Sequence, residues 1–375
     1  MQSASLLYLL SIAFIALGVM RLEQRGWKVF NYLPGIVMVY ALSMLIAQSA
    51  QWHDNEAITQ SYQLLKNNLL PAMLFLMLLS INFKAFLGMG RALLIAYSGA
   101  FISLIFSFVF VFWLFGFSED ESGVFAALSG SWMGGTANML AIGSALHVSE
   151  AQMGYAMIVD SLNYTFWVMS LLALVALAPR FNRWSGASIS HNQISDIGCS
   201  CTIGPKRYWL LLLIAFIVSL SSQVLAMQLE GLSPTTWVVL IATFFGLLGS
   251  QTPLSKVNGA NPIANTMLYL LVALIGSRAN FDDGSGLIGY ITAGTAILVL
   301  HALFMILLAK LFKLDLFSIG VASLANIGGV ASAPLLAAAY NRSLIGIAVL
   351  MAIMGYLIGT FGGLSVGYLL KMLAS

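Results

Sequence analysis

Two Gly-Gly segments interrupt the apolar sequence of this chain: Ser129-Gly130-Ser131-Trp132-Met133-Gly134-Gly135-Thr136-Ala137-Asn138 and Ser323-Leu324-Ala325-Asn326-Ile327-Gly328-Gly329-Val330-Ala331-Ser332. Both are rich in small residues that weaken a helix. Irregular backbone at membrane depth is tolerated only where it is buried in protein or lines a cavity. Each segment is therefore expected to be a broken helix that crosses the bilayer, or a hairpin that enters and leaves by one face.

The composition around these segments is that of a membrane protein. Of the 375 residues, 60% are hydrophobic and only 8% are charged, and the mean hydropathy is +0.94. A soluble domain has roughly 25% charged residues, so this chain could not cover a surface exposed to water. The composition predicts an all-α polytopic membrane protein and argues against soluble enzymes, nucleic-acid-binding proteins and disordered chains.

Ten apolar runs are candidate transmembrane helices, since a helix needs about 20 apolar residues to cross the hydrocarbon core and fewer if polar ends snorkel. They are Ala4–Met20, Tyr32–Gln48, Leu69–Phe83, Ala92–Phe115, Gln152–Ala178, Tyr208–Met227, Thr235–Gly249, Pro262–Ser277, Leu287–Ala309 and Leu344–Leu370. No positive region precedes the first run, so we expect it to be a retained span. The only cysteines, Cys199 and Cys201, lie in a polar stretch and are too close for an easy disulfide.

The two Gly-Gly segments are related by one constant offset. Adding 194 to the residue number carries Ser129 to Ser323 and Gly134-Gly135 to Gly328-Gly329, with no gap. This regularity indicates an internal duplication. It predicts a first repeat over 1–179 with a hairpin at 123–147, a cytoplasmic linker over 180–207, and a second repeat over 208–375 with a hairpin at 317–340.

The positive-inside rule favours hairpins over crossing helices. If both Gly-Gly segments are re-entrant and the N-terminus is outside, 13 of the 16 basic residues lie inside, and only Lys66, Arg278 and Lys371 lie outside. If both segments cross, the better orientation gives 9 inside and 7 outside. Five spans and a hairpin per repeat make the second repeat inverted relative to the first, an arrangement found in many secondary transporters.

The two motifs, with Asp160 downstream of the first, resemble those of the YjcL-type family of bacterial integral-membrane proteins, long catalogued as a domain of unknown function. The ten-span plan with two Gly-Gly hairpins is also similar to the sodium–glutamate symporters and the 2-hydroxycarboxylate transporters. Those families carry Gly-Gly-X-Gly in their re-entrant loops. Here Ala137 and Ala331 stand where the last glycine would be.

Asp160 is the only carboxylate inside any predicted span. A charged residue near the bilayer centre costs about 2.5–3.5 kcal/mol, so it is expected to face a cavity or a partner. Asn163 and Tyr164 follow at i+3 and i+4 and share its helical face. The three residues are predicted to couple an ion, either sodium or a proton. The alternative is a structural Asp that joins two helices.

The Gly-Gly segments are the predicted solute site. Helix N-termini at a break would bind an anion without a buried Lys or Arg. The predicted binding residues are Ser131, Gly134, Gly135, Thr136, Asn138, Asn326, Gly328, Gly329 and Ser332. The alternative is that these small residues only let helices pack closely.

Two further features admit structural explanations. Gly355, Gly359, Gly363 and Gly367 form a stripe with i+4 spacing, which close helix packing explains. His301 is a lone histidine in the ninth span, and a hydrogen-bonded core histidine is favoured over a proton relay.

The sequence thus predicts a cation-coupled, elevator-like symporter of the bacterial cytoplasmic (inner) membrane. Its solute would be a small carboxylate, amino acid or short peptide. No organic cofactor and no nucleic acid are expected, and the partners are the lipid bilayer and a second copy in a homodimer. The alternatives are a channel or a serine-type intramembrane enzyme that pairs Ser131 with His301.

Overall fold

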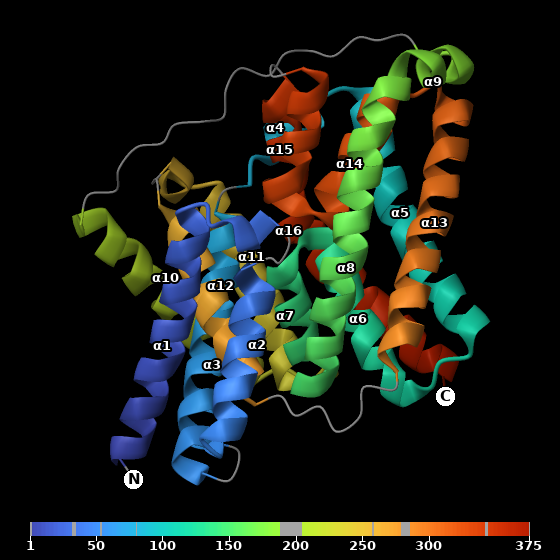
Figure 1. Ribbon diagram of the computed structural model, residues 1–375. Helices are drawn as coiled ribbons and strands as arrows, with labels where there is room; N and C mark the ends of the chain where they lie inside the picture. The colour runs from blue at the N-terminus through green and yellow to red at the C-terminus, as the bar shows by residue number, and fades with distance from the viewer. Residues whose placement is uncertain are drawn as a thin grey trace. The chain divides into compact units, whose positions relative to one another are not determined.

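The computed structural model describes residues 2–31, 35–52, 55–79, 81–187, 205–256, 259–278, 286–341 and 344–374. Throughout these ranges the regular structure is helical (Figure 1). Cys199 and Cys201 and most of the expected linker lie outside the described residues. The helices form two compact units: unit 1 comprises residues 1–80, 144–161 and 202–285, and unit 2 comprises residues 81–143, 162–201 and 286–375.

Unit 1 is a bundle of apolar helices. It contains α1 (Gln2–Gln24), α2 (Gly35–Ser49), α3 (Glu56–Leu78), the start of α8, α10 (Pro205–Ala226), α11 (Pro234–Ser250), α12 (Ala260–Gly276) and the short helices η1 (Lys28–Asn31) and η4 (Pro253–Lys256). Some of its hydrogen bonds join residues that are far apart in the sequence. Tyr8 and Ser277 share a hydrogen bond of 2.9 Å between α1 and the end of α12.

The first residue of α8 is held by several side chains of unit 1. The Glu150 carboxylate accepts a 2.6 Å hydrogen bond from Tyr62 Oη on α3 and lies 3.7 Å from Lys66 Nζ. Tyr40 Oη of α2 donates to the Glu150 carbonyl at 2.8 Å. These contacts fix the start of the helix that carries Asp160.

Unit 2 contains both Gly-Gly segments. Its helices are α4 (Phe83–Leu87), α5 (Arg91–Phe115), α6 (Glu119–Gly134), most of α7 (Thr136–Ala145), the end of α8 (Glu150–Leu174), η3 (Val175–Leu177), α9 (Ala178–Ser185), α13 (Leu287–Phe312), α14 (Leu316–Ile327), α15 (Gly329–Tyr340) and α16 (Ile345–Ala374).

Each Gly-Gly segment folds back on itself as a helical hairpin. A methyl group at Gly130 of α6 would lie 2.9 Å from both Asn138 O and Ile142 Cγ1 of α7. In a straight helix residues 130 and 142 would be about 18 Å apart. In the second segment the rings of Phe317 and Tyr340 are 5.4 Å apart, and α14 and α15 lie side by side (Figure 1).

Both hairpins begin with a capped helix. The Glu121 carboxylate accepts from Ser118 N at 2.9 Å at the start of α6. The Asp315 carboxylate accepts from Ser318 N at 3.0 Å at the start of α14. Such caps satisfy backbone donors that a helix leaves free at its first turn, so they define where each hairpin starts.

Six of the described helices have the length and apolar character needed to cross a membrane: α1, α5, α8 with α9, α10, α13 and α16. The predicted spans agree with the observed helices within a few residues, with one exception. Helix α3 begins at Glu56, whereas hydropathy predicts a span that starts at Leu69. Asn55 caps it by accepting from Ala57 N and Ile58 N, and Lys66 therefore lies inside the helix.

Candidate functional site

The two glycine breaks are the irregular points inside the hairpins. At the first break, Gly135 has φ +88° between α6 and α7, and its N–H donates to Ser131 O at 2.7 Å. At the second break, Gly329 has φ +61°. Residues other than glycine rarely adopt these angles, so glycine permits the reversal of the chain at both places.

Asn138 fastens the first break to α16. Its Nδ2 group donates to Gly355 O at 3.1 Å and to Tyr356 O at 3.2 Å. Its Oδ1 atom accepts from Thr360 Oγ1 at 3.1 Å. Both ends of this buried amide are therefore bonded to α16, which fixes the orientation of the Asn138 side chain. The other expected residues of the break, Ser131 and Thr136, are buried and half-buried.

The stripe on α16 is a close-packing surface for the first hairpin. A methyl group at Gly359 would lie 2.7 Å from Gly134 Cα, and one at Gly363 would lie 3.1 Å from Gly130 Cα. Small residues four apart on both helices let the two backbones approach closely. The packing explanation of the stripe is therefore confirmed for these positions.

Gly355 touches both breaks. A methyl group at Gly355 would lie 3.3 Å from both Gly134 Cα and Met133 O, and 3.6 Å from Ala325 O. Ala325 lies in the last turn of α14, next to the second break. The two Gly-Gly motifs, separated by 194 residues in the sequence, therefore meet on one glycine of α16. The sequence marked Gly355 only as a member of the stripe.

The second break carries two buried oxygens that have no hydrogen-bond partner in the described part of the chain. Asn326 Nδ2 donates to Ala322 O at 2.9 Å, but among the described residues Asn326 Oδ1 has no hydrogen-bond partner. Ser332 Oγ also has no hydrogen-bond partner among the residues that the structure describes. Both residues are at most 1% exposed. Leaving a buried acceptor unpaired costs about 1–3 kcal/mol, so a group that bonded to these two atoms would recover that cost.

Two of the three predicted ion-coupling residues on α8 have contacts that can be named. Tyr164 lies against the second break, since a methyl group at Gly328 would lie 2.6 Å from Tyr164 Cε2. Asn163 is buried against α13, where it accepts from Thr295 Oγ1 at 2.8 Å and donates to Ile291 O at 3.4 Å. Asp160 is half-buried, one turn before Tyr164 on the same helix, in the part of α8 that belongs to unit 1.

His301 is the centre of a buried polar network in unit 2. Its Nδ1 atom lies 2.5 Å from Ser103 Oγ on α5, and its Nε2 atom lies 2.8 Å from Ser323 Oγ on α14. Trp167 Nε1 on α8 donates to the same Ser323 Oγ at 2.9 Å. Both ring nitrogens are therefore engaged by hydroxyls other than Ser131, and this geometry does not support the Ser131–His301 pair of the enzyme alternative.

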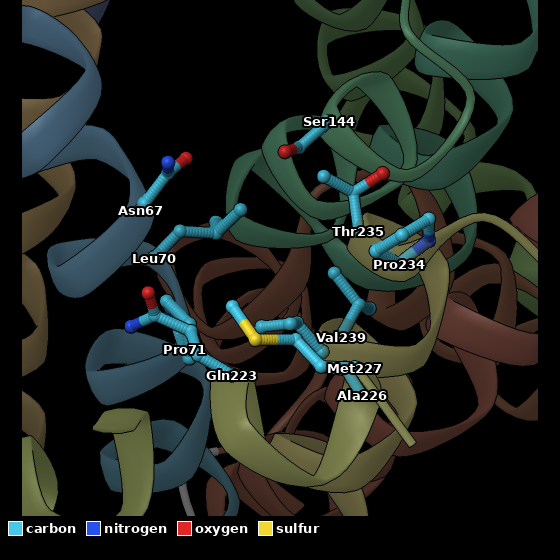
Figure 2. A pocket seen from close by; sticks show the side chains of 11 residues that line it. Asn67, Leu70, Pro71, Ser144, Gln223, Ala226, Met227, Pro234, Thr235 and Val239 are labelled. Carbon is cyan, nitrogen blue, oxygen red and sulfur yellow. The ribbon is translucent and has the colours of Figure 1, made fainter. Parts of the chain in front are cut away.

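A separate cavity of about 150 Å³ lies among helices of unit 1. Figure 2 shows the amides of Asn67 and Gln223 beside the apolar side chains of Leu70, Met227 and Val239. Its lining residues come from α3, the end of α7, the end of α10 and the residue that follows it, and α11. It contains none of the predicted site residues.

No cluster of three or more His, Cys, Asp or Glu side chains that could hold a metal occurs among the described residues.

In a comparison with known protein families, one family model matches nearly the whole chain. Residues 9–373 match a family described as "Protein of unknown function (DUF819)". A comparison with curated proteins gave no match.

Proposed function

This chain belongs to the DUF819 family, whose function is unknown, and we propose that it is a secondary active transporter for a small anionic or zwitterionic organic solute. The observation that carries the proposal is the meeting of two glycine-broken hairpins on Gly355 within unit 2. Broken helices that present backbone groups at one point are the usual binding element of secondary transporters.

The helix lengths support re-entrant hairpins. Helices α6, α7, α14 and α15 have 16, 10, 12 and 12 residues, so the longest measures about 24 Å and the others about 15–18 Å. The hydrocarbon core is about 30 Å thick, so α7, α14 and α15 would not cross it alone, and all three are shorter than α2, the shortest of the ten proposed spans. The six long apolar helices, together with α2, α3, α11 and α12, would supply the ten spans.

The repeats support an elevator-like motion. Helices of the second half begin at Leu287, Leu316, Gly329 and Ile345, close to 194 residues after the helices that begin at Arg91, Glu119, Thr136 and Glu150. Each compact unit draws segments from both halves of the chain. Unit 2, which carries both hairpins, would be the solute-carrying body, and unit 1 would be the scaffold. We expect a homodimer in the bacterial inner membrane with the N-terminus outside.

The first experiment is uptake by the full chain in proteoliposomes. Glutamate, succinate and alanyl-alanine serve as probes, with an inward sodium or proton gradient, after a thermal-shift screen has selected the binding class. Accumulation above the external concentration would support a coupled transporter. Saturable flux that never exceeds equilibrium would contradict coupling, and non-saturable flux would favour the channel alternative.

The second experiment tests the coupling residue. Asp160→Asn removes the one charge expected at membrane depth, so gradient-driven uptake should be lost while the protein still folds. Glu230→Gln is the matched control, because Glu230 is exposed in the turn before α11. Uptake at the wild-type level in Asp160→Asn, per folded molecule, would contradict a coupling role for Asp160.

A further inference from the structure

The two glycine breaks differ at one equivalent position. The offset of 194 that relates the Gly-Gly motifs carries Asn138 to Ser332. Asn138 fills the space beside its glycines with an amide that bonds to Gly355 O and Tyr356 O. Ser332 has a shorter side chain, and its Oγ atom has no hydrogen-bond partner among the described residues.

The Ser332 hydroxyl lies at the break itself. A methyl group at Gly328 would collide with Ser332 Oγ, and it would lie 2.6 Å from Tyr164 Cε2. Glycine at 328 thus leaves room for the hydroxyl, and the ring of Tyr164 closes one side. The second break therefore has the small residue Ser332 at the position where the first break has the longer amide side chain of Asn138.

The unsatisfied atoms are oxygens. The Asn326 amide is oriented by its Nδ2 donor to Ala322 O, because the reversed amide would set two oxygens against each other. Its Oδ1 atom is then left as an acceptor without a partner among the residues described. It lies in the last turn of α14, directly before the break.

We propose that the second break binds a sodium ion through Asn326 Oδ1 and Ser332 Oγ, at the position equivalent to that of the Asn138 amide in the first break. Hydroxyl, amide and backbone oxygens at the end of a broken helix suit a small hard cation. This proposal deepens the transporter function and rests on it for its role: sodium bound beside Tyr164 would be the coupling ion.

The test measures sodium binding in the absence of any solute. The full chain is purified in detergent with choline chloride, which is replaced by sodium or potassium chloride at constant ionic strength while the Tm is recorded. Sodium should raise the Tm by on the order of 2–5 °C at saturation, because it binds the folded state alone. Potassium and choline should have no such effect.

Three variants and one control connect the shift to this site. Ser332→Ala and Asn326→Leu remove one ligand each and should lose most of the sodium response. Ser332→Asn should copy the first break, so its Tm in choline should be higher than that of the wild type and should not respond to sodium. Ser365→Ala, on the exposed side of α16, should respond as the wild type does.

Several outcomes would overturn the proposal. The first is that sodium does not raise the Tm of the wild type, and the second is that sodium raises the Tm of Ser332→Ala and Asn326→Leu as much as that of the wild type. The third is that alanine or glutamate raises the Tm and sodium does not, which would assign these oxygens to the amine of a solute. The arms also separate the two proposals. Sodium binding without uptake of any probe would support the sodium site and contradict the transporter function. Uptake of a probe without sodium binding would support the transporter function and contradict the sodium site.

Discussion

At the scale of single residues, the His301 network has one consistent arrangement of protons. Ser103 Oγ donates to Ala100 O at 2.8 Å, so the Nδ1–H of His301 donates to Ser103 Oγ. The Nε2 atom then accepts from Ser323 Oγ, which itself accepts from Trp167 Nε1. Every donor hydrogen in this network has an acceptor when the imidazole is neutral. The network therefore holds α5, α8, α13 and α14 of unit 2 together without a charged group.

His301→Phe tests this assignment. The substitution keeps an aromatic ring but leaves the Ser323 hydroxyl without its acceptor, so the free energy of unfolding should fall by about 1–3 kcal/mol. Thermal unfolding in detergent measures the loss. Uptake per folded molecule should persist, because the histidine is fully engaged in structural bonds. Loss of uptake with unchanged stability would instead support a proton relay at His301.

Residues of the site differ in how far the sequence could predict them. Gly135 and Gly329 were identified because a turn inside an apolar segment needs glycine. The sequence also predicts that Asn163 shares a helical face with Asp160 and Tyr164, and in the structure Asn163 bonds to Thr295 and Ile291 on α13. Helical spacing shows which side chains share a face, and only the packing of distant helices decides which of them find partners.

At the scale of helices, the glycine stripe of α16 should be intolerant of a single added methyl group. Gly359→Ala would collide with Asn138 Nδ2 and come within 2.7 Å of Gly134 Cα, and overpacking of this kind costs about 1–3 kcal/mol. Gly18→Ala on α1 is the control, because no heavy atom lies within 4 Å of the added methyl. Its stability should be unchanged or higher, since alanine favours helix more than glycine does.

The Tm values of Gly359→Ala and Gly18→Ala, each compared with that of the wild type, measure the cost of the added methyl group. An equal effect of Gly359→Ala and Gly18→Ala would show that α6 and α16 are not in close contact.

Helix α3 shows why element boundaries were harder to predict than elements. Its first half is polar, so hydropathy placed the start of the span at Leu69. In the structure those polar groups find partners: Tyr62 bonds to Glu150, and the Asn68 carbonyl accepts from Ser219 Oγ at 2.9 Å. Hydropathy counts each polar residue as a cost, whereas a partner on another helix offsets that cost.

At the scale of the whole molecule, the repeats predicted from the sequence differ from the compact units. The sequence divides the chain into consecutive halves, because duplication acts on a continuous segment. The structure sorts pieces of both halves into each unit. Unit membership depends on which helix faces bury each other, and in helices that are apolar on all sides the sequence gives little sign of that choice.

The membrane topology of the whole chain can be tested at the ends of both hairpins. Ser118 and Ser149 flank the first hairpin, Lys313 and Asn341 flank the second, and all four are exposed. In a background with Cys199 and Cys201 replaced by serine, single cysteines at Ser118 and Ser149 should react with an impermeant maleimide from outside. Cysteines at Lys313 and Asn341 should react only from inside, because the second repeat is inverted.

If the two ends of either hairpin react from opposite sides, that segment crosses the membrane, and the distribution of basic residues would no longer favour an N-terminus outside.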